Sequence, residues 1–232
     1  MRMVIVGDGR MGRAVAAQAE TRGHVIHAFI GAKENADGRA LTAERLRGAD
    51  VAVEFTKPEA VVANLERLIE AGIPAVTGTT GWRAELPRIE ALVERRRGAL
   101  LHAANFSVGV HLFLRAARDL ARRFAERPAF DAFILEQHHA GKLDAPSGTA
   151  RELQARLHQA DPARPFPITS VRAGATPGTH AVAYDGPYER VTLQHESRSR
   201  EGFAAGALAA AEWLPGHPGV HTVEEMLFGA DG

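Results

Sequence analysis

The sequence predicts an α/β protein: an N-terminal, doubly wound parallel sheet followed by a smaller α+β domain. Three observations predict this fold. Short apolar runs alternate with helical patterns through roughly the first hundred residues, as in parallel strands joined by crossover helices. A glycine-rich turn, Gly7-Asp8-Gly9-Arg10-Met11-Gly12, comes directly after the first apolar run. After Phe124 the pattern changes to mostly strands, which indicates a second domain.

The composition disfavours several classes of protein. The 232 residues fit one large or two small domains. The chain has no cysteine, which excludes disulfides and thiol chemistry and suits the cytoplasm. A net charge of zero disfavours a nucleic-acid partner or an anionic membrane surface. No stretch approaches the roughly 18 apolar residues of a membrane span, and no signal peptide precedes the first strand. We therefore expect a cytoplasmic enzyme.

The first apolar run, Met3–Val6, is expected to be a buried strand, and a helix is expected at 13–21. Between them, G-x-G-x-x-G predicts a dinucleotide site formed by Gly7, Asp8, Gly9, Arg10, Met11 and Gly12. The first glycine makes a tight turn, the second lets a pyrophosphate approach the backbone, and the third lets the helix pack on the strand. The alternative is an incidental glycine-rich turn.

The later elements follow in order along the chain. In the first domain, strands are expected at 25–30, 51–55, 73–77 and 99–103, and helices at 58–71 and 83–97. Ligands of such sheets bind beyond the carboxyl ends of the strands, so two loops are expected to contact the cofactor: Gly78-Thr79-Thr80-Gly81 and Ala103-Ala104-Asn105-Phe106. Without the first motif, ordinary connecting turns would be the preferred interpretation of both.

The second domain begins after Phe106. Helices are expected at 108–124 and 150–159, strands at 130–137 and 166–172, and a hairpin from 179–185 and 190–196. Two final helices at 202–214 and 223–228 lead back to the first domain. We therefore assign 1–106 and about 212–232 to the dinucleotide-binding domain, and 107–211 to a substrate and tetramerisation domain.

The stretch Glu136–Ala150 reads E-Q-H-H-A-G-K-L-D-A-P-S-G-T-A and predicts a reaction centre for an acidic substrate. Neighbouring residues of a strand point to opposite faces, so His138 and His139 have different roles unless the strand has already ended. Lys142 returns to the same space if the chain turns at Gly141. Ser147 or Thr149 can cap the next helix, the latter as a capping box with Glu152. A helix N-terminus binds anions, so the start of this helix, Ser147 to Thr149, is expected to bind a carboxylate of the substrate.

The use of lysine supports this interpretation. Only three of the 28 basic residues are lysines, at positions 33, 57 and 142. Arginine stays charged, whereas lysine can lose its proton, so Lys142 is the residue type that acid–base chemistry requires. The alternatives are a solvated histidine pair with a surface lysine, or a metal site from His138, His139 and Asp144. The metal site is less favoured, because adjacent histidines seldom bind one ion.

Taken together, these motifs resemble the 4-hydroxy-tetrahydrodipicolinate reductase family, also called dihydrodipicolinate reductase, of bacterial lysine and diaminopimelate biosynthesis. The resemblance covers nearly the whole chain, and includes the Phe-Thr-x-Pro of residues 55–58. It implies a Rossmann domain, a substrate domain, a homotetramer and a dicarboxylate substrate. It also implies that His138 donates and accepts a proton, that Lys142 is a second proton donor, and that His139, Gly148 and Thr149 contact the substrate carboxylates. The glycine loop is one residue shorter than the family's G-x-x-G-x-x-G.

The end of the second strand, at Ile30, bears on the choice of cofactor. A carboxylate there usually binds the ribose of NAD, and none occupies residues 28–32. Lys33 could instead reach the 2′-phosphate of NADP. We therefore expect use of both NADPH and NADH, with NADPH at least as good. Glu34 leaves the reverse order open, because a slightly later strand end would make it the ribose acceptor.

Two other functions are compatible with the residues. One is a reductase of the same build that acts on a different imine or carbonyl compound, since fold and cofactor do not fix the substrate. The other is a dinucleotide sensor without catalytic activity. A sensor does not need a histidine at 138 or a lysine at 142, so the presence of both residues favours an enzyme.

Overall fold

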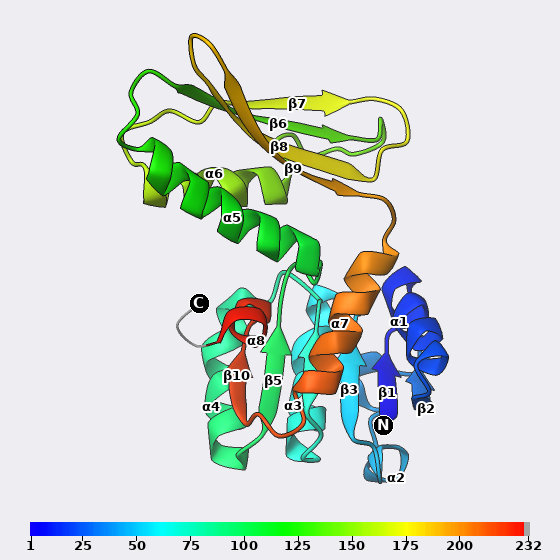
Figure 1. Ribbon diagram of the computed structural model, residues 1–232. Helices are drawn as coiled ribbons and strands as arrows, with labels where there is room; N and C mark the ends of the chain where they lie inside the picture. The colour runs from blue at the N-terminus through cyan, green and yellow to red at the C-terminus, as the bar shows by residue number, and fades with distance from the viewer. Residues whose placement is uncertain (230–232) are drawn as a thin grey trace. The chain divides into compact units, whose positions relative to one another are not determined.

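The computed structural model describes residues 1–229, which form two compact units (Figure 1). The first unit comprises Met1–Ser107 and the chain from Glu201 onward, and the second comprises Val108–Arg200. The first boundary lies one residue from the expected one. The second lies earlier than the expected 212, because the helix that begins at Glu201 packs in the core of the first unit. No helix of the described residues is long and apolar enough to cross a membrane.

The first unit is built on a six-stranded parallel sheet. Its strands lie in the order β10 (Gly219–His221), β5 (Ala99–His102), β4 (Ala75–Thr77), β3 (Val51–Glu54), β1 (Arg2–Val6) and β2 (Val25–Ile30). The strand order reverses between β1 and β3, which is where such sheets bind ligands. The edge strand β10 was not expected, because a three-residue, half-buried strand carries no readable apolar pattern.

Helices cover both faces of this sheet, as a doubly wound fold requires. One face is covered by α1 (Arg10–Thr21), α7 (Glu201–Trp213) and α8 (Val223–Phe228), and the other by α2 (Ala43–Leu46), α3 (Pro58–Glu70) and α4 (Leu86–Arg96). Two short 3₁₀ turns, η1 (Ala36–Gly38) and η2 (Arg83–Glu85), complete the unit. Within β1, Met3 and Ile5 point to the first core and Val4 and Val6 to the second, so both faces of the strand are apolar.

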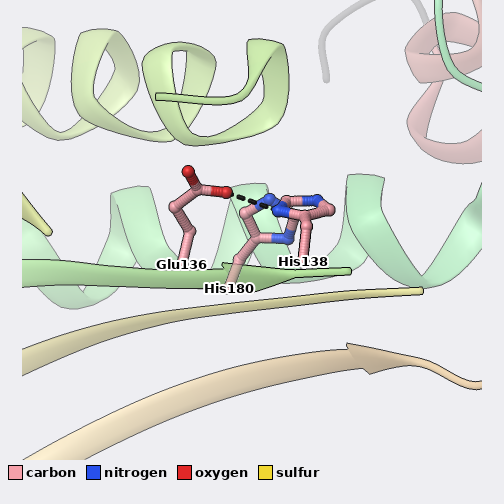
Figure 2. Close-up of side chains that lie close together, drawn as sticks. All are labelled: Glu136, His138 and His180. Carbon is pink, nitrogen blue, oxygen red and sulfur yellow. Dashed lines mark ion pairs between the residues drawn. The ribbon is translucent and has the colours of Figure 1, made fainter. Parts of the chain in front are cut away.

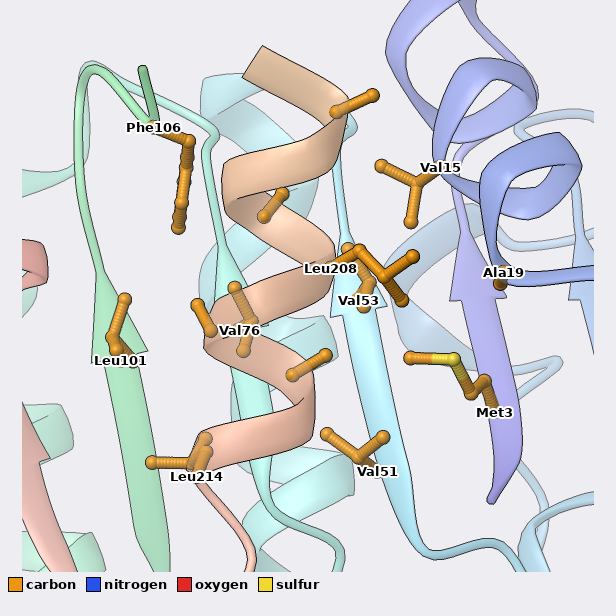
Figure 3. Close-up of a cluster of buried hydrophobic side chains, with 14 of the residues drawn as sticks. Met3, Val15, Ala19, Val51, Val53, Val76, Leu101, Phe106, Leu208 and Leu214 are labelled. Carbon is orange, nitrogen blue, oxygen red and sulfur yellow. The ribbon is translucent and has the colours of Figure 1, made fainter. Parts of the chain in front are cut away.

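Helix α7 lies close against the sheet because its buried side chains are small. Four of its alanines are fully buried, and Figure 3 shows the helix crossing the strands of this face with Leu208 among the larger apolar side chains. At Gly206 a Cβ atom would lie 1.7 Å from the carbonyl oxygen of Phe106. The helix therefore requires glycine at this position to contact the loop after β5.

The second unit is a four-stranded mixed sheet with two helices on one face (Figure 1). Its elements are α5 (Val108–Phe124), β6 (Asp131–His138), α6 (Gly148–Ala160), β7 (Ile168–Arg172), β8 (Gly178–Asp185) and β9 (Arg190–Ser197). The strand order is β7-β6-β8-β9, with β6 and β7 parallel and the other pairs antiparallel. The expected β8–β9 hairpin is confirmed, with Asp185 paired to Arg190.

We predict that Gly206→Ala destabilises the protein. The new methyl group would collide with the backbone of Phe106, and overpacking of this kind costs about 1–3 kcal/mol. Thermal and denaturant unfolding followed by circular dichroism measures the change. The matched control is Gly202→Ala on the same helix, where a Cβ meets no atom within 4 Å. The control should keep or raise stability, and equal melting temperatures for the two variants would contradict the packing argument.

Candidate active site

The glycine-rich turn between β1 and α1 has the geometry expected of a dinucleotide loop. Gly7 has a φ of 109°, and a Cβ there would lie 2.1 Å from the carbonyl oxygen of Phe55. A Cβ at Gly12 would lie 2.0 Å from the oxygen of Gly7. Around Gly9, in contrast, no atom lies within 4 Å of the Cβ position. The first and third glycines are thus required by packing, and the second leaves the backbone open to a ligand.

Helix α1 begins at Arg10 and Met11, directly after this opening. Gly9 is the N-cap residue, and no described side chain caps the helix. The free N–H groups and the helix dipole favour an anion such as a pyrophosphate. The residues present therefore fit a dinucleotide in chemistry and in the space beside Gly9.

A cavity of about 380 Å³ lies beside this turn, at the switch point of the sheet. It is lined by residues of the glycine loop, the end of β2 and the loop after β3: Gly7, Asp8, Gly9, Ile30, Gly31, Ala32, Asn35, Ala36, Asp37, Phe55, Thr56, Lys57, Glu59 and Ala60. Lys57 is the lysine among these lining residues, and Lys33 is exposed and outside them. The acidic lining residues are Asp8, Asp37 and Glu59, so the cavity has more acidic than basic side chains around it.

Two carboxylates lie at the end of β2, although the segment 28–32 contains none. Asp8 accepts a hydrogen bond from the Ala32 amide at 3.2 Å, and this bond holds the pKa of Asp8 below its usual value. Glu34 pairs with Arg45 at 2.9 Å and accepts from the Gly31 amide at 3.1 Å, and these contacts lower the pKa of Glu34. Both side chains are therefore ionised near the expected ribose position.

The two other predicted cofactor loops are joined to the core beneath them. Gly78 contacts the ring of Phe55, which packs edge-on against Phe106 at 5.8 Å. Thr79 is buried and its hydroxyl accepts from the Thr56 amide at 2.8 Å. In contrast, Thr80 and Ala104 are exposed. The two loops lie at the carboxyl ends of β4 and β5, as expected, and they contact Phe55 and Thr56 after β3.

A buried carboxylate, Glu54, organises these loops and was not singled out from the sequence. Its oxygens accept from the Thr77 hydroxyl at 2.5 Å and the Asn64 amide at 3.3 Å, and from the Thr56 hydroxyl. Since Glu54 is fully buried, these neutral donors replace water around its carboxyl group. The available sequence signal was a charged residue that ends an otherwise apolar strand.

The predicted reaction centre lies at the end of β6 in the second unit. Figure 2 shows Glu136, His138 and His180 gathered on the side of the sheet where α6 lies. Glu136 and His138 are two residues apart, so they share this face, and His180 of β8 is paired directly with Glu136. All three side chains are buried. The structure thus adds Glu136 and His180 to the predicted centre.

Glu136 is held by cationic and backbone donors. Its Oε1 accepts from Nη2 of Arg172 at 2.6 Å and from the Ser147 amide at 3.3 Å, and its Oε2 lies 2.6 Å from Nδ1 of His138. Burial alone would raise the pKa of Glu136, but the hydrogen bonds, led by that from Arg172, lower it to about 2. The carboxylate is therefore charged at neutral pH.

The pKa values of both buried histidines, His138 and His180, are lowered. Burial lowers the pKa of His138, and the charges of Lys142 and Arg172 lower it further, while the Glu136 carboxylate acts in the opposite direction. Burial lowers the pKa of His180 to about 4, so this ring is neutral at physiological pH. Its Nε2 lies 3.1 Å from the Ser147 hydroxyl.

The three ligand atoms of Glu136, His138 and His180 lie within 4.8 Å of one another, as in a metal site. A tetrahedral ion with bonds of about 2.0–2.2 Å holds its ligands roughly 3.3 Å apart. Glu136 Oε2 and His138 Nδ1 are only 2.6 Å apart, closer than two ligands of one such ion, and form a close ion-pair contact instead. This group includes neither His139 nor Asp144, the other members of the metal site considered from the sequence.

The chain turns at Ala140 and Gly141, and Lys142 returns near His138, as expected from the sequence. The Lys142 ammonium lies 2.7 Å from a carboxylate oxygen of Asp144. His139 follows the end of β6, and its ring lies near Gly141. The two adjacent histidines therefore have different surroundings, in line with the expected alternation.

Ser147 is the N-cap of α6, and accepts from the Ala150 amide at 3.2 Å. The expected capping box of Thr149 and Glu152 is wrong, because the helix begins at Gly148 and Thr149 lies inside it. The hydroxyl and the amide of Ser147 both have partners within the protein. Gly148 is exposed and Thr149 half-buried, so they are the more accessible residues of this helix start.

A larger hollow of about 860 Å³ lies elsewhere in the second unit. It is lined by residues of the turn after α5, the start of β6, α6 and the segment before β7, including Arg164 and Phe166. None of the site residues predicted from the sequence lines it. This hollow is thus distinct from the cluster around Glu136.

Comparison with known proteins agrees with this architecture. The family models named "Dihydrodipicolinate reductase, N-terminus" and "C-terminus" match residues 1–106 and 109–227. The 4-hydroxy-tetrahydrodipicolinate reductases of Christiangramia forsetii and Thiobacillus denitrificans are 31% and 36% identical, each with 98% of both chains covered. A dipicolinate-bound dihydrodipicolinate reductase from Paenisporosarcina sp. TG-14 has the same fold, with a TM-score of 0.83 and 23% identity over 98% of this chain and 100% of that one. The chain belongs to the dihydrodipicolinate reductase family.

Proposed function

We propose that the chain reduces 4-hydroxy-tetrahydrodipicolinate to tetrahydrodipicolinate, in diaminopimelate and lysine biosynthesis in the cytoplasm. The observation that carries the proposal is the buried His138 beside Lys142 at the end of β6, in a chain of this family. Full-length relatives at 31% and 36% identity carry the name of this activity.

The chemistry requires an acid beside the ring of the substrate. Loss of the hydroxyl group as water leaves a ring in which C=C is conjugated with C=N. The nicotinamide, when bound at the glycine loop, supplies a hydride. Negative charge then moves toward the ring nitrogen and the adjacent carbon, and a proton must be added there. A positioned acid accelerates such a step by about 10²–10⁴. We assign this proton to His138, with Lys142 as the second donor.

The two carboxylates of the substrate need positive or N–H groups. His139 and the start of α6 at Gly148 and Thr149 offer these groups next to the proposed acids. We propose that they bind a carboxylate, and that Ser147 supports them from beneath, because its own polar groups are bonded inside the protein.

His138→Ala and Lys142→Ala should each lower kcat by about 10²-fold or more with little change in nucleotide affinity. His139→Ala and Thr149→Ala should mainly raise KM. The measurement is loss of nicotinamide absorbance in an assay coupled to the synthase that makes the substrate. Pyridine-2,6-dicarboxylate, a planar dicarboxylate, should compete with the substrate.

If the wild-type chain binds the reduced nucleotide but does not oxidise it, the proposed activity is wrong, and the assignment of the fold is unaffected. Near-native kcat in Lys142→Ala would show that Lys142 is a surface charge and not the second proton donor. Activity on another imine, without competition by pyridine-2,6-dicarboxylate, would identify a different reductase.

We further propose NADH and NADPH as hydride sources, with NADH ahead of NADPH. The expectation that NADPH is at least as good depended on residues 28–32, which lack a carboxylate. Asp8 and Glu34 reach the same strand end from outside that segment. A 2′-phosphate there would meet two negative charges: Glu34 is paired with Arg45, whereas Arg13 and Lys33 act on Asp8 only as nearby positive charges.

Asp8→Asn should raise kcat/KM for NADPH relative to NADH by roughly threefold to tenfold, because a like charge is removed. The gain should shrink at high ionic strength, since the side chain is only half-buried. Glu44→Gln, an exposed change outside the cavity, is the matched control. An unchanged ratio in Asp8→Asn would show that this carboxylate does not face the ribose.

We also propose that the chain forms a homotetramer through the sheet of the second unit. Helices α5 and α6 occupy one face of this sheet (Figure 1). On the other face, Leu135 of β6 and Val171 of β7 are 42% and 37% exposed. Exposed apolar side chains on an open sheet face favour association.

Leu135→Asp should reduce the mass measured by sedimentation equilibrium, because it places charges in the proposed interface. Leu143→Asp changes an equally apolar, 98% exposed side chain outside the sheet and should leave the mass unchanged. A tetramer that survives Leu135→Asp would place the interface elsewhere.

A further inference from the structure

We propose that Glu136 is a positioning residue for His138: it holds a proton on Nδ1, so that Nε2 is the nitrogen that exchanges the reacting proton. The inference rests on the proposed function, in which His138 is the acid. It assigns a role to a side chain that contacts His138 and not the substrate.

The geometry of the pair defines which ring nitrogen is engaged. Glu136 Oε2 lies 2.6 Å from Nδ1 of His138, the distance of a close ion pair, with the ring turned so that the two atoms do not meet hydrogen-bond geometry. The other ring nitrogen faces a different space, 3.0 Å from the position of a Cβ on Gly178. No side chain of residues 1–229 forms a hydrogen bond with that nitrogen. Nδ1 thus faces a carboxylate that attracts a proton on this nitrogen, and Nε2 is left for chemistry.

Glu136 is itself fixed, as a positioning group must be. Its Oε1 is taken by Arg172 and by the Ser147 amide, so only Oε2 is left for His138. The parallel pairing of β6 with β7 places Arg172 beside His138, and α6 begins at Gly148, directly after Ser147. Rotation of the carboxyl group would break contacts to two other elements. The direction of its second oxygen is therefore set before a substrate arrives.

Glu136 also supplies the negative charge that an imidazolium needs. The charged groups that face His138 are Glu136 on the same strand, Arg172 on β7 and Lys142 from the loop. The uncharged groups are neutral His180 on β8 and Ser147 before α6. Two of the charged groups are cationic, and burial also disfavours a charged ring. Glu136 is the group among them that favours protonation. A paired carboxylate has the same effect on the histidine of hydrolase triads, where its loss lowers kcat by about 10⁴.

The test is Glu136→Gln, which keeps the size of the side chain and an oxygen for Arg172. The amide can present a donor to Nδ1, which favours the wrong tautomer. We expect kcat to fall about 10²- to 10⁴-fold with nucleotide KM unchanged. The limb of the kcat/KM profile that falls with rising pH should move to lower pH by about 1–3 units, because removal of the carboxylate lowers the pKa of His138.

A second measurement does not depend on turnover. Nitrogen-15 NMR of the histidine rings, assigned by loss of one signal in His138→Gln, reports which nitrogen carries the proton. Wild-type His138 should be protonated on Nδ1 when neutral, and Glu136→Gln should lose this preference. Asp131→Asn, at the exposed opposite end of β6, is the matched control and should leave the signals and the pH profile unchanged.

Three outcomes would overturn the assignment: wild-type kcat and pH profile in folded Glu136→Gln, a loss of kcat with no change in the profile or tautomer, or a wild-type His138 protonated on Nε2. If Glu136→Gln does not fold, the wild-type spectrum alone tests the assignment, because it shows which nitrogen of His138 carries the proton. If the wild-type protein is inactive but His138 still carries its proton on Nδ1, the proposed function is wrong, and the role of Glu136 toward His138 still holds.

Discussion

The polar end of the second unit depends on one buried ion pair, between Glu136 and Arg172. A carboxylate with no exposed surface is stable only when donors replace the water it has lost, and removal of one partner of such a pair typically costs about 3–5 kcal/mol. Arg172 comes from β7, the second donor is the amide before α6, and the third partner is His138. Three elements are therefore held in one arrangement by one side chain.

The first unit also contains a buried carboxylate, but neutral donors stabilise it in place of a cation. Glu54 ends β3 as a fully buried carboxylate, and its partners are hydroxyl and amide groups of Thr56, Thr77 and Asn64. No cation is needed, because several neutral donors converge on it. In both units a buried glutamate lies at or near the carboxyl end of a strand, Glu54 as the last residue of β3 and Glu136 two residues before the end of β6. Each carboxylate joins neighbouring loops where the apolar core gives way to polar groups, and so the loops that carry the proposed site are attached to the core.

Most of the fold and the main site segment could be predicted from the sequence. Glycine positions, apolar runs and helix ends are local signals, and they located β2, α5 and α8 to the residue. The missing parts depend on pairing between distant residues. Arg172 and His180 join the centre only through the register of β6 with β7 and β8, which no local pattern reveals. Asp8 likewise reaches the end of β2 by a turn of the glycine loop, outside the segment in which a carboxylate was sought.

The position of α7 in the chain has a consequence for protein synthesis. This helix covers β3 and β4 of the first unit, yet it lies after residue 200, beyond the whole second unit. Residues leave the ribosome in order, so the part of this face over β3 and β4 stays without α7 until the whole second unit has been synthesised. The second unit is a continuous segment and is complete earlier. During that interval the exposed strands are the part of the chain most open to aggregation and to chaperone binding.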